Sequence, residues 1–308
     1  MKISCQTGAR RRTLWRNRCT RGGAAIWIVL SVACALFLAL ADLVTKKYCS
    51  AHGPFEIAFG RVLFALPALW VFALIDGIPA VDPGIVPVYL IALPLELGAL
   101  VMYMRAITIS PLSLTVPFLS FTPAFLAVSA PVMLGEHASP AGVLGIAGIV
   151  AGAYALHLPS VRRGALAPVM MIVRERGSLL MLGVAFIYSI TSLLGKRGVL
   201  CSSPSFFAAT YFTLLALPLF ALATARGTLR SVFSRELVAA GLLAAAMISF
   251  HMAAIRIAPV SYMIAIKRAS LLFGIVFGSL FCGETGLREK LVGGLLMVAG
   301  MLGIAMWG

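Results

Sequence analysis

The chain has 308 residues, of which 61% are hydrophobic and only 11% are charged. Soluble domains carry about 25% charged residues, so this composition excludes a single water-soluble domain and indicates an all-α integral membrane protein embedded in the lipid bilayer. The formal net charge of +15 does not indicate nucleic-acid binding, because seven of the 25 basic residues precede residue 22, in a tail that would attract nucleic acid only non-specifically.

Residues 1–23 form this basic N-terminal tail. The positive-inside rule favours a cytoplasmic anchor that precedes the first span. An organelle-targeting segment and an over-extended start site are the alternatives.

Five apolar stretches follow in the first half, and each is long enough to cross a bilayer, which takes about 20 residues. We expect them near 24–45, 55–75, 84–105, 111–134 and 140–158. Ser139 is the expected N-cap of the fifth helix, with Pro140 at its first position. Pro94, Pro117 and Pro123 lie inside the third and fourth spans, where they can interrupt helical hydrogen bonding.

Residues 159–177 form the connector between the halves. Its apolar run, 167–173, is too short to cross a bilayer, so it is predicted to lie at the membrane surface as an amphipathic segment, a plain loop being the alternative. The second half repeats the plan of the first. Its helices are expected near 178–195, 204–224, 236–257, 259–281 and 288–307.

An internal repeat is marked by the pairs Gly135-Glu136 and Gly283-Glu284, which are separated by an offset of 148 residues. Each pair ends an apolar run and precedes a polar turn and a Gly-rich helix. Further upstream the offset becomes 150, as in the match of Lys46 with Lys196. The chain is therefore a duplication, with one five-helix repeat at 24–158 and another at 178–308. Since five is odd, the second repeat enters the membrane from the opposite side, which predicts ten transmembrane helices as two inverted repeats.

The candidate site residues are charged or titratable side chains inside the predicted spans, namely Arg61, Glu96, His251, Lys267 and Arg268. A charge at the centre of a span costs about 2.5–3.5 kcal/mol, so such residues normally face a cavity or one another. We expect Lys267, supported by Arg61 or Arg268, to bind an anionic substrate, with Glu96 balancing the empty site. A permanent Glu96–Lys267 ion pair is the alternative. Because neighbouring helical residues point about 100° apart, Lys267 and Arg268 are not expected to face the same narrow cavity.

Other polar and small residues are interpreted as structural. Glu136 and Glu284 precede the fifth helix of each half, where a carboxylate stabilises the helix dipole by about 0.3–1 kcal/mol; a proton-carrying role is the alternative. Asp42 and Glu56 are expected at the membrane interface. Helix packing is expected at two small-residue pairs, Gly148 with Gly152 and Ala299 with Gly303.

No catalytic motif is present, and the six cysteines show neither CxxC nor metal-ligand spacing. The four histidines are scattered along the chain. We therefore expect no enzymatic activity, no metal and no cofactor.

The two Gly-Glu motifs, each closing a five-helix half with a Gly-rich helix, resemble the EamA-type family of the drug/metabolite transporter superfamily. Residues 54–61, where Arg61 follows Pro54 by seven residues, also resemble that family's second helix. The resemblance covers about residues 24–306. It implies a secondary transporter that moves a small organic metabolite by alternating access through a cavity between the halves. Both termini would be cytoplasmic, in a bacterial inner (plasma) membrane. A lipid-facing flippase and a structural or enzymatic multi-span protein are the alternatives.

Overall fold

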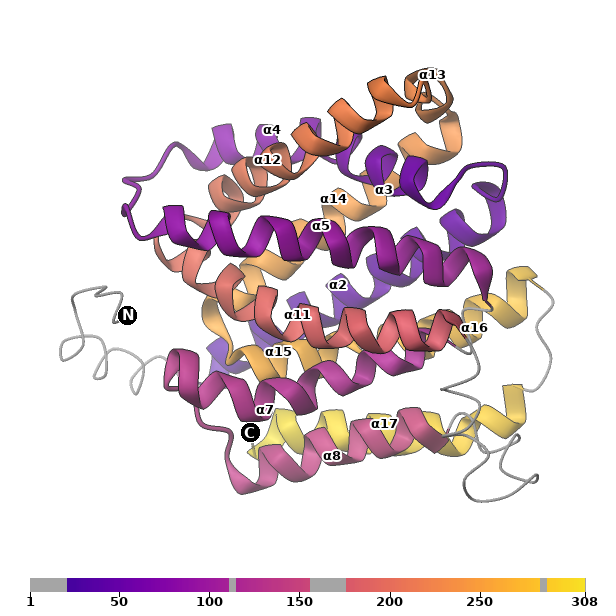
Figure 1. Ribbon diagram of the computed structural model, residues 1–308. Coiled ribbons are helices and arrows are strands. Elements are labelled where there is room, and N and C mark those ends of the chain that lie inside the picture. Colours follow the sequence, from indigo (N-terminus) through magenta and orange to yellow (C-terminus); the bar gives the residue numbers. More distant parts are fainter. Residues whose placement is uncertain (1–20, 111–114, 156–175, 283–286, 308) are drawn as a thin grey trace.

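The computed structural model describes residues 21–110, 115–155, 176–282 and 287–307, and the regular structure within these ranges is helical (Figure 1). The first half contains α2 (Arg21–Tyr48), α3 (Pro54–Leu63), α4 (Leu66–Asp76), α5 (Ile85–Ile109), the 3₁₀ helix η1 (Val116–Ser120), α7 (Phe121–Leu134) and α8 (Pro140–Ala155). The second half contains α11 (Arg176–Leu200), α12 (Pro204–Ala225), the short α13 (Leu229–Val232), α14 (Arg235–Ile257), α15 (Val260–Lys267), α16 (Ser270–Cys282) and α17 (Leu287–Trp307).

Some predicted features lie outside the described residues. These are nearly all of the basic tail, most of the connector 159–177, and the second Gly-Glu pair, Gly283 and Glu284.

Seven helical segments of the described chain are long and apolar enough to cross a membrane. They are Ile26–Tyr48, Pro54–Asp76, Ile85–Ile109, Arg176–Leu200, Pro204–Ala225, Arg235–Ile257 and Val260–Phe281. Three shorter apolar helical segments accompany them, at Phe118–Leu134, Pro140–Gly152 and Gly293–Ile304. The protein is therefore an integral membrane protein, whereas the expected count of ten spans stays a prediction.

The second predicted helix is interrupted, which the sequence analysis did not anticipate. Helix α3 ends at Leu63, and α4 begins at Leu66 with Pro67 in its first turn. Proline has no N–H for the carbonyl four residues earlier, which here belongs to Leu63, and its ring clashes with that carbonyl. The break between α3 and α4 is therefore a consequence of Pro67.

The fourth helix of each half is also interrupted, and at matching positions of the repeat. In the first half η1 ends at Ser120 and α7 begins at the next residue. In the second half α15 ends at Lys267, and the amides of Arg268 and Ala269 bond the carbonyls three residues back, at 3.0 and 2.9 Å. These are 3₁₀-type bonds, which tighten the backbone and end an α-helix. The break in α15–α16 was not predicted, because this segment has no counterpart of Pro117 or Pro123.

The two halves exchange packing partners. Helix α2 packs on α14, and the equivalent helix of the second half, α11, packs on α5. Helices α8 and α17 lie side by side along one edge of the bundle (Figure 1). The α2–α14 contact is thus repeated as α11–α5, as two copies related by a two-fold axis require.

The α8–α17 contact depends on glycines. A Cβ atom on Gly145 would lie 2.8 Å from the carbonyl oxygen of Gly300, and one on Gly152 would lie 2.6 Å from that of Gly293. Small residues allow such close helix approach in membranes. Ala299, expected in this contact, is instead exposed. The start of α8 agrees with the prediction, since Ser139 Oγ accepts a hydrogen bond from the Gly142 amide at 2.9 Å.

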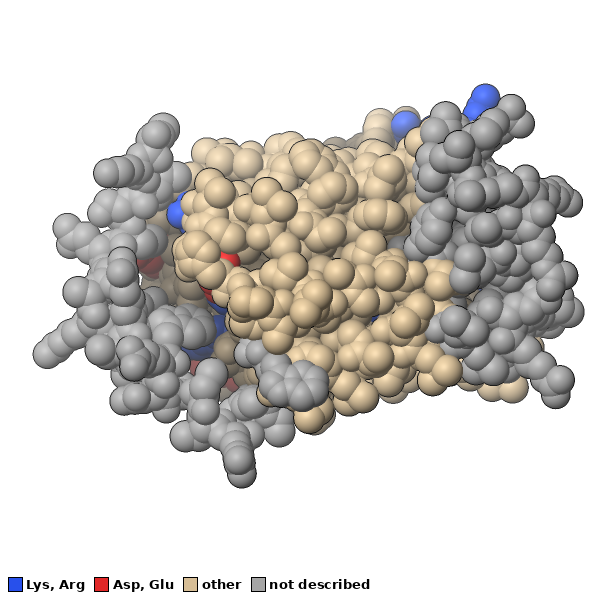
Figure 2. Space-filling model, turned by 90° about the horizontal axis from the view of Figure 1, so that it is seen from below, with Lys and Arg blue, Asp and Glu red and all other residues tan. Residues whose placement is uncertain are grey.

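The outer surface suits contact with lipid. In the face seen in Figure 2, most of the visible charged residues lie toward the ends of the molecule, and other residues fill nearly all of the band between them. Large apolar side chains are exposed in this bundle, among them Leu144 at 75% and Leu295 at 68%. Water would not tolerate so much exposed apolar surface, whereas a bilayer does.

Candidate functional site

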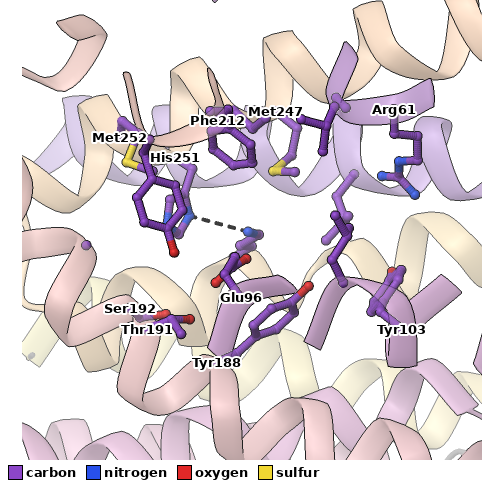
Figure 3. Close-up of a pocket in the computed structure, with 18 of the residues that line it drawn as sticks. Arg61, Glu96, Tyr103, Tyr188, Thr191, Ser192, Phe212, Met247, His251 and Met252 are labelled. Carbon is purple, nitrogen blue, oxygen red and sulfur yellow. Dashed lines mark hydrogen bonds between the residues drawn. The ribbon is translucent and has the colours of Figure 1, made fainter. Parts of the chain in front are cut away.

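A cavity of about 140 Å³ lies between the two halves (Figure 3). Its lining comes from α2, α3, α5 and η1 of the first half and from α11, α12, α14 and α15 of the second. All five residues predicted from their charge inside the spans line it, namely Arg61, Glu96, His251, Lys267 and Arg268. The helices thus bring together residues that are 207 positions apart, from 61 to 268.

Arg61 is engaged in a buried network at one end of the cavity. Its Nη1 donates to Asp42 Oδ1 at 2.9 Å, and the Tyr103 hydroxyl donates to Asp42 Oδ2. Arg61 and Asp42 are each 5% exposed. Asp42 is therefore buried inside the protein, whereas its expected depth at the membrane interface stays a prediction. The positive charge of Arg61 is neutralised within the protein rather than offered to a ligand.

Lys267, His251 and Glu96 occupy the middle of the cavity. Lys267 Nζ lies 3.3 Å from His251 Nδ1, the contact drawn as a dashed line at His251 in Figure 3. An ammonium group can only donate, so His251 Nδ1 accepts. Glu96 lines the cavity together with Thr191 and interacts with Lys267 through charge. Among the described residues no ion pair joins Glu96 to Lys267, so the permanent pair that was the alternative is not seen.

Arg268 is buried without a full set of partners. Its side chain is 3% exposed, and its Nε atom has no hydrogen-bond partner among the described residues. The helix ends at Lys267, and Arg268 begins the tight turn that follows, with φ −68° and ψ −7°. Both cations nevertheless line one cavity. The expectation that they would not share a cavity is therefore wrong.

Several cavity residues were missed in the sequence. Tyr188 and Thr191 of α11 and Tyr211 of α12 line the cavity beside the charged groups. The internal repeat could have identified Tyr211, because it matches the candidate residue Arg61 at the offset of 150. Tyr103 likewise matches His251 at the offset of 148. Equivalent positions of the two halves thus form facing parts of one cavity, with different side chains.

Glu136 lies away from this cavity lining and joins the two halves. Its Oε2 accepts the backbone amide of Val260 at 2.9 Å, and its Oε1 accepts from the Lys196 ammonium group. Lys196, 1% exposed, also donates to the Ala258 carbonyl at 2.6 Å. Glu136 therefore caps the beginning of α15, in the other half, rather than α8, the helix that follows it in the chain.

The backbone conformation of Gly135 explains why the Gly-Glu motif begins with glycine. Its φ is 67°, in the left-handed region that glycine adopts readily, and it ends α7. The amide of Gly135 bonds the Pro131 carbonyl, and the next amide bonds the Ala130 carbonyl. The turn places the Glu136 carboxylate beside α15.

Comparison with known proteins agrees with this architecture. The model of the EamA-like transporter family matches residues 25–158 and again residues 175–306. No curated protein sequence matches the chain. Among 28 matching chains of solved structures is a crystal structure described only as that of a protein; it has a TM-score of 0.67 and 17% sequence identity, over 92% of this chain and 98% of the other. At that identity the likeness shows the fold alone. Since the two family matches cover nearly the whole chain, the protein belongs to the EamA-like transporter family, with one copy of the family unit in each half.

Proposed function

We propose that the protein is a secondary transporter that moves a small organic metabolite by alternating access, with the cavity between the halves as its substrate site. The observation that carries this proposal is the lining of that cavity, to which both repeats contribute charged residues inside an otherwise apolar bundle. Transporters built from inverted repeats bind their substrates near the bilayer midplane, between the repeats. The family match supports the same conclusion.

The proposed topology has ten spans in two inverted five-helix repeats, with both termini in the cytoplasm of a bacterium. The exchange of packing partners between α2–α14 and α5–α11 supports a two-fold relationship. The three shorter apolar segments would complete the ten spans. Reporter fusions after residues 80, 165 and 230 test the topology, and the first two are expected on opposite sides of the membrane.

Charged groups within the cavity favour transport over a purely structural role. Each buried charge costs several kcal/mol unless it is paired, and a structural bundle would gain nothing from keeping Glu96, Lys267 and Arg268 at its centre. A flippase for lipids would need a path from the cavity to the bilayer between helices, and this alternative is tested by the same experiment.

The experiment fills the cavity at one position. Gly195 lines the cavity, and a Cβ atom added there would meet nothing within 4 Å. Gly195→Trp is therefore expected to block the cavity without a backbone clash. Gly98→Trp is the matched control, because Gly98 is also free of contacts but lies exposed on α5 outside the cavity lining.

The variants are compared in cells that overproduce or lack the protein, in a screen of metabolite uptake and efflux. We expect wild type and Gly98→Trp to change the level of one or more small organic metabolites, and Gly195→Trp to abolish that change at equal abundance in the membrane. Identical metabolite profiles for Gly195→Trp and wild type would show that the cavity is not the transport path. A change confined to lipid distribution would favour the flippase.

A further inference from the structure

We propose that the cavity selects a small organic monoanion, a carboxylate on an apolar or aromatic body, held by the guanidinium of Arg268 and the ammonium of Lys267. This inference rests on the proposed function, because it assumes that the cavity is the substrate site. It adds the charge and chemical class of the substrate. Three independent features of the cavity support it.

The first feature is the charge balance of the cavity. Asp42 neutralises Arg61 through a direct ion pair. Among the other described lining residues, Lys267 and Arg268 contribute two positive charges and Glu96 one negative charge, while His251 accepts from Lys267 and is neutral in that contact. The empty cavity therefore holds an excess of one positive charge. A ligand with a single negative charge leaves it neutral.

The second feature is the unmet bonding capacity of Arg268. Its Nε is buried without a partner in the described part of the chain, although buried polar atoms are nearly always hydrogen-bonded. A guanidinium presents parallel N–H groups that match the two oxygens of a carboxylate. The side chain is 3% exposed and lines the cavity, so a ligand in the cavity is placed to supply the missing acceptor.

The third feature is the apolar wall that surrounds these cations. Phe212, Met247 and Met252 line the same cavity, with Phe212 and Met247 side by side in Figure 3. Tyr188 lies across the cavity from them (Figure 3). Such a wall accommodates a hydrocarbon or ring, whereas the cations bind one polar end. The cavity therefore suits an amphipathic small molecule rather than an inorganic ion.

Charge also separates a carboxylate from a phosphate monoester. At pH 7 a phosphate monoester carries about −1.5 to −2 charges, which would leave the cavity with a net negative charge beside Glu96. A single carboxylate avoids this repulsion. The two anion classes are therefore distinguishable by affinity.

Thermal unfolding of the full-length protein purified in detergent tests the inference directly. The probes are butyrate, hexanoate and benzoate, their three amides, the amines butylamine, hexylamine and benzylamine, and phenyl phosphate. A ligand that binds the folded state raises the unfolding temperature in proportion to the logarithm of its concentration. We expect at least one carboxylate to raise it more than its own amide, its amine or phenyl phosphate does.

Arg268→Met provides the sharper test. It removes a buried cation whose Nε has no hydrogen-bond partner among the described residues, so the empty protein is expected to unfold at the same or a higher temperature. The carboxylate effect is expected to weaken about tenfold to a hundredfold in affinity, the range for a lost bond to a charged group. Arg256→Met is the matched control, because Arg256 lies exposed near the end of α14, and it should leave carboxylate binding unchanged.

The outcomes separate this inference from the proposed function. Amides or amines could stabilise the protein more than the matching carboxylates do, with the effect lost in Gly195→Trp. This result would overturn the inference of a monoanionic substrate but leave the cavity as the substrate site. No stabilisation by any carboxylate, or unchanged carboxylate binding in Arg268→Met, would overturn it as well. Failure of the proposed function itself is read separately, from an unchanged metabolite profile of Gly195→Trp in cells.

Discussion

Lys196 of the second half donates to the carboxylate of Glu136 in the first, and the same carboxylate caps the first amide of α15 at Val260. The Lys196 side chain is 1% exposed and the Glu136 side chain 21% exposed, so the ion pair is largely removed from water. One residue of the repeated Gly-Glu motif thus binds two helices of the opposite half. The contact connects the halves on one side of the cavity.

Glu136→Ala is expected to lower the free energy of unfolding by roughly 3 kcal/mol, near the lower end for breaking one side of a buried ion pair. The reason is that Lys196 would keep its hydrogen bond to the Ala258 carbonyl but lose the carboxylate that balances its buried charge. Thermal or denaturant unfolding in detergent measures the loss.

Asp76→Ala is the control for this substitution. Asp76 is exposed at the end of α4, and it forms none of the ion pairs found among the described residues. Surface substitutions away from such contacts usually change stability by less than about 0.5 kcal/mol, so the control should lose far less stability. Equal losses in the two variants would contradict the importance of the cross-half contact.

The sequence predicted a structural role for Glu136 but assigned it to the wrong helix. A repeated Gly-Glu pair after an apolar run indicates a helix end, and only the next helix in the chain can be named from order along the sequence. Which distant helix approaches that end depends on tertiary packing. Here Val260 and Lys196, both from the other half, are the residues that Glu136 contacts.

The charged residues around the cavity could be predicted from the sequence, because a charge inside a membrane span is costly and normally faces a cavity or another charge. That cost identified Arg61, Glu96, His251, Lys267 and Arg268, and the structure places all five in one lining. Their pairing was not predictable. Asp42 lies six residues before the end of α2, a position that is equally compatible with the interface, and its burial against Arg61 follows from how α2 and α3 pack.

Of the helix breaks, one could be predicted from the sequence and another could not. Pro67 breaks the second helix for a reason that can be read from the sequence, because proline lacks the N–H that the helix needs. The turn after Lys267 contains no proline, so local sequence carries no comparable signal. Its match to the end of η1 indicates that the bend belongs to the duplicated architecture itself.

Asp42→Asn is expected to lower the free energy of unfolding by about 3–5 kcal/mol, because Arg61 would keep its charge in a buried site without a carboxylate. The double variant Asp42→Asn with Arg61→Gln should recover most of that loss, since neither side is then charged. Chemical denaturation of the single and double variants gives the comparison. Asp76→Asn, at an exposed position at the end of α4, should change stability by less than about 0.5 kcal/mol.

Gly152→Ala is expected to destabilise the protein by about 1–3 kcal/mol, because the new Cβ would lie 2.6 Å from the Gly293 carbonyl oxygen and push α8 from α17. Gly148→Ala, one turn earlier on α8, is the control. Its nearest neighbour would be the Gly300 Cα at 3.4 Å, which is an ordinary contact. Unfolding temperatures that fall equally for both variants would contradict a tight contact at Gly152.

Cys49 is expected to resist alkylation. Burial raises the pKa of its thiol to about 11, and the residue is fully buried just beyond the end of α2. The reactive thiolate is formed only as pH rises toward that value, so at pH 8 a maleimide should react roughly two orders of magnitude more slowly than with a free thiol of pKa about 8.5. The rate should keep increasing with pH up to about 11.

The measurement uses a variant in which Cys49 is the single cysteine, compared with a single-cysteine variant carrying Ala51→Cys. Ala51 is exposed, so the cysteine that replaces it should react rapidly. As the pH is raised, its reaction rate should reach a plateau at a lower pH than the rate of Cys49 does. Similar rates and similar pH profiles would show that Cys49 is not buried and that the pKa of its thiol is not raised.

Glu96→Gln is expected to tighten the binding of a carboxylate and slow its release. Glu96 interacts with Lys267 through charge without an ion pair. The Glu96 carboxylate and a bound anion therefore compete for the positive charge of Lys267. Two like charges about 10 Å apart at an effective dielectric constant of about 20 repel by roughly 1.7 kcal/mol, which corresponds to somewhat more than a tenfold change in affinity. Tighter binding with slower exchange should lower both the apparent KM and the maximal transport rate in proteoliposomes.

Thr191→Val is the control for this variant, because Thr191 also lines the cavity and its replacement keeps the charge of Glu96. Its affinity for the carboxylate should stay within about threefold of wild type. The double variant Glu96→Gln with Lys267→Met separates competition from a permanent structural pairing of the two residues. If the two residues only stabilised each other, the double variant would regain stability and transport together. Competition for the substrate predicts a folded double variant that binds and transports the carboxylate poorly, because the cation that receives it has been removed.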